Sequence, residues 1–165
     1  MIELRRISIL DKNMRECIEL EVLDHQKEFV ASNAESLADE FDTNKASNRN
    51  GKGDTAVAYA ACHDGRMVGF AMYAYFPPGE YSNDEHCYYF WRLMVDRRHQ
   101  GKGIGRRIVS LVMEEIKTKP MGDAKYCYVS YDPKNDGSRA LFKSHGFVED
   151  GRVIDGETVA RCLIS

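Results

Sequence analysis

Three glycines on alternate positions, Gly101, Gly103 and Gly105, lie between Gln100 and the basic Arg106. Glycine has no Cβ, so the backbone N–H groups of such a turn can converge on an anion. The apolar residues that follow have helical spacing, and the positive end of a helix dipole would point at the same place. These residues predict a site for a phosphate-bearing ligand that is held mainly by the backbone.

Two common phosphate-binding motifs do not fit this stretch. A P-loop ends in Gly-Lys-Ser or Gly-Lys-Thr, whereas Lys102 is followed by Gly103, which has no hydroxyl for magnesium. A dinucleotide fingerprint has the pattern GxGxxG, and here the third glycine comes one residue early. The simpler alternative is a glycine-rich hairpin or helix cap. An apolar strand pattern just before the turn, a strong helix pattern just after it and the clustered basic side chains favour the phosphate site.

The pattern of apolar and turn residues predicts the elements that position this turn. We expect strands at 2–8, 55–62, 67–76, 87–95, 124–130, 147–153 and 157–164. We expect helices from 13 to about 25, from 32 to about 41, from 104 to 116 and from 135 to about 145. Possible capping boxes start the first two helices at Asn13 and Ser32, and Asp-Gly pairs at 64–65 and 155–156 indicate hairpins. Residues 44–54 are polar, contain two glycines and are expected to form a mobile loop.

The resulting order is β-α-α-β-β-β-α-β-α-β-β, which indicates a single α/β domain over residues 1–165 with one mixed central sheet flanked by helices. A net charge of −3 gives no support for nucleic acid as a partner. No apolar run is long enough to span a membrane, and residues 1–10 do not resemble a signal peptide, so we expect a cytoplasmic protein. The five cysteines and five histidines lack the spacing of metal ligands, so no metal is expected.

Two local motifs carry a resemblance to a known family. Residues 100–105 (QGKGIG) fit Q/R-x-x-G-x-G/A, and residues 135–147 (NDGSRALFKSHGF) fit N-x-x-[SA]-x-x-[LF]-[YF]-x-x-x-G-F. They resemble motifs A and B of the GCN5-related N-acetyltransferases (GNAT), and the element order resembles that family over essentially the whole chain. The resemblance implies the GNAT (acyl-CoA N-acyltransferase) fold, acetyl-CoA as co-substrate and transfer of an acetyl group to an amine.

The resemblance also implies where the cofactor binds. It would lie where the strand ending at Leu93–Val95 splays away from the strand 124–130, with backbone groups of Leu93 and Val95 paired to the pantetheine arm. The N–H of Leu93 or of its neighbour would polarise the acetyl carbonyl, and the amides of 100–106 would hold the pyrophosphate. The implied cofactor-binding residues are Leu93, Met94, Val95, Gln100, Gly101, Lys102, Gly103, Ile104, Gly105, Arg106, Asn135, Phe142 and Lys143.

Proton transfer is the part of the family pattern from which this chain departs. Many relatives use a tyrosine of motif B as the general acid, and Phe142 stands at that position. Tyr131 is our candidate for the acid, with Ser144, His145 or solvent as alternatives. Candidates for a proton relay from the amine are Glu85 and Asp84, and the alternative is that both are solvated loop acids.

Acidic residues suggest the acceptor. The segment from Glu28 to Asp42 holds five acids and no Lys or Arg. Acidic walls would attract a polycation, although a solvated helix face explains the same pattern. The chain also resembles bacterial spermine/spermidine (diamine) acetyltransferases, so we expect a polyamine acceptor near Glu35, Asp39, Asp84 and Glu85. Alternatives are another acceptor, such as an antibiotic, an amino acid or a protein N-terminus, or a non-catalytic CoA-binding regulatory module. A homodimer is possible.

Overall fold

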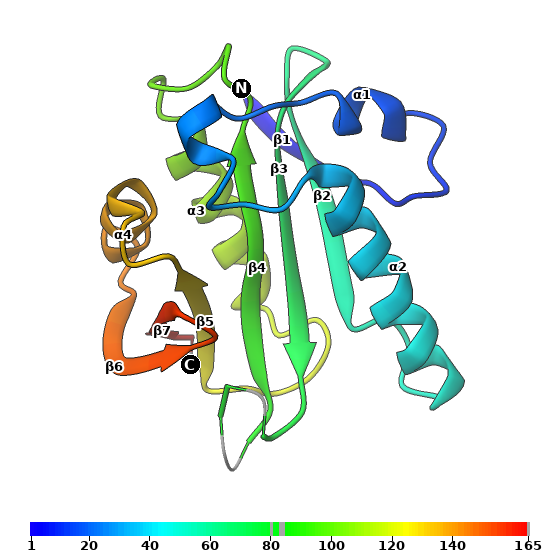
Figure 1. The fold of residues 1–165 in the computed structure, drawn as a ribbon. Helices are drawn as coiled ribbons and strands as arrows, with labels where there is room; N and C mark the ends of the chain where they lie inside the picture. Colours follow the sequence, from blue (N-terminus) through cyan, green and yellow to red (C-terminus); the bar gives the residue numbers. More distant parts are fainter. Residues whose placement is uncertain (80, 83–84, 165) are drawn as a thin grey trace.

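The computed structural model describes residues 1–79, 81–82 and 85–164, and its seven strands form one mixed sheet in the order β1-β2-β3-β4-β5-β7-β6 (Figure 1). The strands are β1 (Ile2–Arg6), β2 (Ala56–His63), β3 (Arg66–Phe76), β4 (Cys87–Val95), β5 (Tyr126–Tyr131), β6 (Val148–Ile154) and β7 (Glu157–Leu163). The helices are α1 (Met14–Ile18), the 3-10 helix η1 (Asp24–Gln26), α2 (Asn33–Arg49), α3 (Ile104–Ile116) and α4 (Asp136–Lys143). The expected element order is confirmed, with η1 added.

Helices cover both faces of the sheet. One core holds the buried stripe of α3, including Ile108 and Val112, together with Phe90 of β4 and Phe142 of α4. The other core, under α1 and α2, includes Leu37. The central strands therefore contribute apolar side chains in both directions, which explains why the sequence of β4 is apolar almost throughout.

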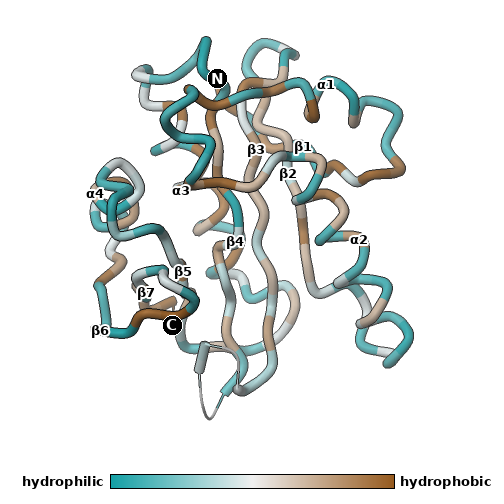
Figure 2. The backbone as a smooth tube through the Cα atoms, in the orientation of Figure 1, coloured by the Kyte–Doolittle hydropathy of each residue, from teal (hydrophilic) through white to brown (hydrophobic). Residues whose placement is uncertain are grey.

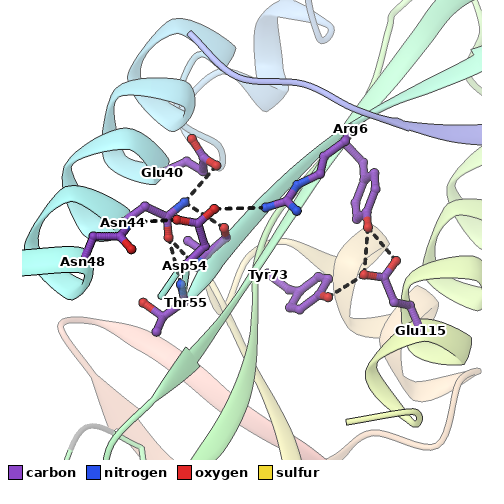
Figure 3. Close-up of polar contacts among 10 residues, drawn as sticks. Arg6, Glu40, Asn44, Asn48, Asp54, Thr55, Tyr73 and Glu115 are labelled. Atoms are coloured by element: carbon purple, nitrogen blue, oxygen red, sulfur yellow. Dashed lines mark hydrogen bonds and ion pairs between the residues drawn. The ribbon is translucent and has the colours of Figure 1, made fainter. Parts of the chain in front are cut away.

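Helix α2 is longer than predicted, because it continues to Arg49 and the expected loop 44–54 begins only after that residue. Figure 2 shows that this end of α2 is hydrophilic, which is why the sequence suggested a loop. The reason is tertiary. The side chain of Asn44 accepts hydrogen bonds from the N–H groups of Thr55 and Ala56 and donates to the Ala56 carbonyl, all at 2.9 Å (Figure 3). A polar side chain thus docks this turn of the helix on the start of β2.

The first predicted helix is wrong in its extent. Only Met14–Ile18 is α-helical, and Asn13 forms no side-chain cap hydrogen bond. Glu16, expected to complete a capping box, instead accepts a hydrogen bond from the Met67 N–H at 3.0 Å. Its carboxylate is used to attach α1 to β3.

The other local signals are confirmed. Ser32 Oγ accepts from the Glu35 N–H at 3.2 Å, and a Glu35 carboxylate oxygen accepts from the Ser32 N–H at 3.0 Å, so this capping box starts α2. The two Asp-Gly turns, at 64–65 and 155–156, have positive φ at both residues. This is the turn geometry that matches the twist of a hairpin. No helix in the described part of the chain has the length and apolarity needed to cross a membrane.

Candidate active site

The cavity lies where β4 and β5 separate. These parallel strands are paired at Tyr88–Cys127 and Tyr89–Tyr128, and at no later position among the described residues. A cavity of about 690 Å³ occupies the opening. Its walls include residues 89–95 of β4 and 129–131 of β5, together with residues of the segment 22–35 and of α4, and the glycine turn that follows β4 also lines it. The diverging ends of the two strands leave backbone groups of β4 available to a ligand that lies along the strand.

A β-bulge shapes the β4 wall. Tyr73 pairs with Phe90 and Met72 with Arg92, so Trp91 is one residue more than β3 can pair. Trp91 packs on the α2 side, and Leu93 packs against the α3 core. Bulges often occur beside active sites because they redirect backbone and side chains. The bulge here falls within the segment that lines the cavity.

The glycine turn has the backbone conformation that the sequence suggested. Gly101 and Gly103 have φ of 75° and 76°, in the left-handed region. A Cβ at either position would meet no atom within 4 Å, so the requirement for glycine is one of backbone conformation and not of space. Gly103 is the N-cap residue of α3 and supplies no side-chain cap hydrogen bond. The first N–H groups of α3 are therefore suited to an anion at the cavity end.

The side chain of Gln100 holds this turn in place. Its Nε2 donates to the Val95 carbonyl at 2.9 Å and to Gln26 Oε1 at 2.8 Å. Gln26 lies in η1, 74 residues earlier in the chain. The glycine turn is thus fastened both to the end of β4 and to η1. The sequence predicted a role only for the backbone of Gln100, and nothing in the sequence indicated a role for Gln26.

Most of the predicted cofactor residues meet in this one cavity. Ten of the thirteen line it: Leu93, Met94, Val95, Gln100, Gly101, Gly103, Ile104, Gly105, Asn135 and Phe142. Lys102, Arg106 and Lys143 are exposed and are not among its lining residues. Asn135 is also the N-cap residue of α4, where its Oδ1 accepts from the Ser138 N–H at 3.1 Å. Phe142 is 3% exposed and makes an edge contact with Phe90.

Tyr131, the candidate acid, lines the cavity. Its ring stacks on Phe142 with centroids 6.5 Å apart, and its hydroxyl donates to Glu149 at 2.9 Å. Burial, and then the hydrogen bond to Glu149, raise the pKa of Tyr131 to about 12. The phenol therefore keeps its proton at neutral pH. The two alternative acids, Ser144 and His145, are not among the residues that line the cavity.

The structure divides the four acids predicted near the acceptor. Glu35 lines the cavity, whereas Asp39 does not and lies 3.4 Å from Arg92 Nη2, a residue of the cavity wall. Glu85 lines a small separate pocket beside Lys119 and Lys125. It precedes β4, and at about 3.3 Å per residue it is roughly 20 Å along the strand from Trp91. The structure therefore does not bring Glu85 to the predicted site. Asp84 falls outside the described residues.

Among the cavity residues that were not predicted, three are connected to one another. Tyr89, Ser130 and Glu157 all line the cavity, and their side chains form a hydrogen-bonded chain. They come from three strands that are far apart in the sequence, and no local motif marks them. Glu28 adds a further carboxylate to the wall, and Lys27 adds an ammonium group.

Comparison with known proteins agrees with this geometry. The profile of the Acetyltransferase (GNAT) family matches residues 15–147. The spermine/spermidine N(1)-acetyltransferase of Bacillus subtilis (strain 168) is 32% identical over 100 residues, which cover 59% of this chain and 63% of that protein. The match thus leaves more than a third of the relative uncovered.

Solved structures share the fold over nearly the full length. The PaiA N-acetyltransferase of Thermoplasma acidophilum, crystallised with coenzyme A, superposes with a TM-score of 0.66, 13% identity and 99% coverage of both chains. A GNAT acetyltransferase of Elizabethkingia anophelis, with acetyl-CoA bound, superposes with a TM-score of 0.62 and 12% identity over 98% of this chain and 97% of that one. With the family profile covering residues 15–147, these findings show that the chain belongs to the GNAT family of acetyltransferases.

Proposed function

We propose that this protein transfers an acetyl group from acetyl-CoA to a primary amine, by direct attack of the amine on the thioester in a ternary complex. The observation that carries the proposal is the single cavity between β4 and β5, which ends at the left-handed glycine turn and the start of α3. One end suits a pyrophosphate and the strand edge suits an extended amide-containing arm.

In this scheme two steps are assigned to residues of the cavity wall. The N–H of Leu93 stabilises negative charge on the acetyl oxygen as the amine attacks. Tyr131, which stays protonated because of its raised pKa, gives a proton to the departing thiolate. The amine must be neutral to attack, and an alkyl ammonium has a pKa of ~10.4, so a proton acceptor is also needed.

A polyamine such as spermidine or spermine is our proposed acceptor. The carboxylates of Glu28, Glu35 and Glu157 line the cavity and favour a cation with several charges. Arg92 also lines it, but its guanidinium lies against Asp39 and over the Trp91 ring. The relatives named spermine/spermidine N(1)-acetyltransferase and probable spermine N(1)-acetyltransferase support the same acceptor.

The test is release of free thiol from acetyl-CoA with a panel of acceptors: spermidine, spermine, an aminoglycoside, free amino acids and a peptide with a free N-terminus. We expect the highest kcat/KM with a polyamine. Good turnover of another acceptor with none of spermidine would replace the polyamine with that acceptor. Binding of CoA without thiol release for any acceptor would favour a regulatory CoA-binding module.

We also propose that the protein forms a homodimer. Strand β6 is an edge of the sheet, and its apolar Val148 and Val153 are 68% and 65% exposed. Exposed apolar edges are suited to pairing with another chain. Light scattering after size-exclusion chromatography should give twice the mass of the chain, and a monomer mass would contradict the proposal.

A further inference from the structure

Three side chains that line the cavity form a hydrogen-bonded chain that ends at a carboxylate. The hydroxyl of Tyr89 lies 2.5 Å from Ser130 Oγ, and Ser130 Oγ donates to Glu157 Oε2 at 2.6 Å. Tyr89 is paired with Tyr128 at the last position before β4 and β5 separate. Ser130 follows two residues later, and β7, which carries Glu157, pairs with β5 on its other side. The fold therefore places the three residues where the two strands begin to diverge.

The hydrogen positions follow from counting donors. A serine hydroxyl has one hydrogen, and that of Ser130 is directed to Glu157. The hydrogen between Tyr89 and Ser130 must then come from Tyr89. The Tyr89 oxygen keeps its two lone pairs. A hydrogen bond with Tyr81, whose ring stacks on the Tyr89 ring with centroids 4.2 Å apart, uses at most one of them. An acceptor site on Tyr89 is left for a donor from the cavity.

We propose that Tyr89, Ser130 and Glu157 form a relay that removes the proton from the acceptor ammonium, with Glu157 as the final base. This rests on the proposed acetyl transfer to an amine. One ammonium N–H bond breaks and its proton binds the Tyr89 oxygen. The former Tyr89 proton passes to Ser130, and the Ser130 proton passes to Glu157. The balance is a neutral amine and a protonated Glu157 carboxyl, with both hydroxyls restored.

Other carboxylates are less well connected to the point where the strands diverge. Glu35 is held in the capping box with Ser32. Glu149 accepts from Tyr131 and from Arg139. The remaining charged or titratable side chains that line the cavity are Lys27, Glu28, Arg92 and His99. Glu157 is the carboxylate that a continuous line of hydroxyls joins to the β4 wall.

The test is steady-state kinetics at saturating acetyl-CoA with the best amine of the panel, from pH 6 to pH 10, on Glu157→Gln, Ser130→Ala and Tyr89→Phe. Loss of a general base costs about 10²-fold or more in kcat, so we expect that loss near pH 7 for Glu157→Gln. The deficit should shrink toward pH 10, because free amine becomes abundant near its own pKa of ~10.4. Ser130→Ala should show the same pH-dependent deficit although the carboxylate is still present.

Two control variants match these changes. Asp155→Asn removes one charge from the same hairpin, at a position of positive φ that asparagine tolerates. Tyr126→Phe removes a hydroxyl from β5, and Tyr126 is not among the residues that line the cavity. Both should keep the wild-type kcat and pH profile. CoA affinity measured by calorimetry should be unchanged in every variant, which shows that each has folded.

The outcomes separate the relay from simpler roles. A raised KM for the amine with unchanged kcat and pH profile in Glu157→Gln would overturn the relay and leave an electrostatic binding role. The relay would also be overturned if Ser130→Ala kept the kcat and pH profile of the wild type while Glu157→Gln lost activity. If the wild-type protein acetylates no amine, the proposed function itself is rejected. If the wild-type protein is active and Glu157→Gln has the same kcat and pH profile, the relay alone is rejected.

Discussion

The two halves of the cavity are built in different ways. The cofactor half is made largely of backbone, with left-handed glycines at 101 and 103, the N-terminus of α3 and the free edge of β4. The acceptor half is made of side chains from η1 to β7, such as Glu28, Arg92 and Glu157. A backbone site needs one local conformation, whereas a side-chain site needs several distant elements to meet. We therefore expect changes in the first half to affect binding of CoA and changes in the second to affect the amine and the proton.

The largest effect is expected at the glycine turn. Gly103→Asp places a carboxylate where the pyrophosphate would bind. We expect CoA affinity to fall by more than about 100-fold, because two negative charges about 4 Å apart near a protein surface repel each other by several kcal/mol. Calorimetry measures the affinity. Gly151→Asp is the matched control, because Gly151 also has positive φ with open space around its Cβ position and does not line the cavity. Equal CoA binding by both variants would show that the turn does not hold the cofactor.

The next effect concerns Tyr131. Removing its hydroxyl in Tyr131→Phe should lower kcat about 10- to 100-fold, since general acid catalysis contributes on that order. With its pKa raised to about 12, Tyr131 stays protonated below that value and should add no basic limb to the kcat profile between pH 6 and pH 10. CoA affinity should not change. An unaltered kcat in this variant would assign protonation of the thiolate to solvent.

A smaller effect is expected from the acidic wall. Glu35→Gln removes a charge and keeps a side chain that can complete the capping box with Ser32. We expect KM for spermidine to rise about 3- to 10-fold, which is about 1 kcal/mol, while KM for acetyl-CoA stays constant. Asp42→Asn on the same helix, outside the cavity wall, is the control. Equal KM values for the two variants would make the acids of α2 a solvated face.

The smallest effect lies outside the cavity and tests stability alone. Tyr73 is fully buried, and its hydroxyl donates to Glu115 of α3 at 2.6 Å (Figure 3). The hydroxyl of Tyr59 donates to the same carboxylate. Tyr73→Phe should cost about 1 kcal/mol and lower Tm by about 2–4 °C for a domain of this size. Kinetic constants at 25 °C should match the wild type. A large change in kcat would mean that the α3 core is coupled to the site.

The same contrast explains which parts of the fold the sequence could predict. The hairpins at Asp64-Gly65 and Asp155-Gly156 follow from turn chemistry, and the Ser32–Glu35 capping box follows from spacing. The end of α2 could not be predicted, because Asn44 stabilises it through contacts with residues 55 and 56 of the neighbouring strand. The first helix was predicted to reach about residue 25 but ends at Ile18, and beyond it the backbone of Glu21 hydrogen-bonds to Asp96 and Arg97 and not within a helix.

The sequence by itself determined the glycine turn, the apolar strand before it and the helix after it, because each depends on neighbours along the chain. Only the tertiary structure decided which acids face the cavity. It excluded Glu85, which precedes β4, and it joined Glu157 to Ser130 and Tyr89 across three strands. The physical reason is that left-handed φ and helix dipoles are local properties. A side-chain hydrogen bond instead requires two atoms within about 3 Å, and the pairing of the strands in the sheet is what brings these side chains together.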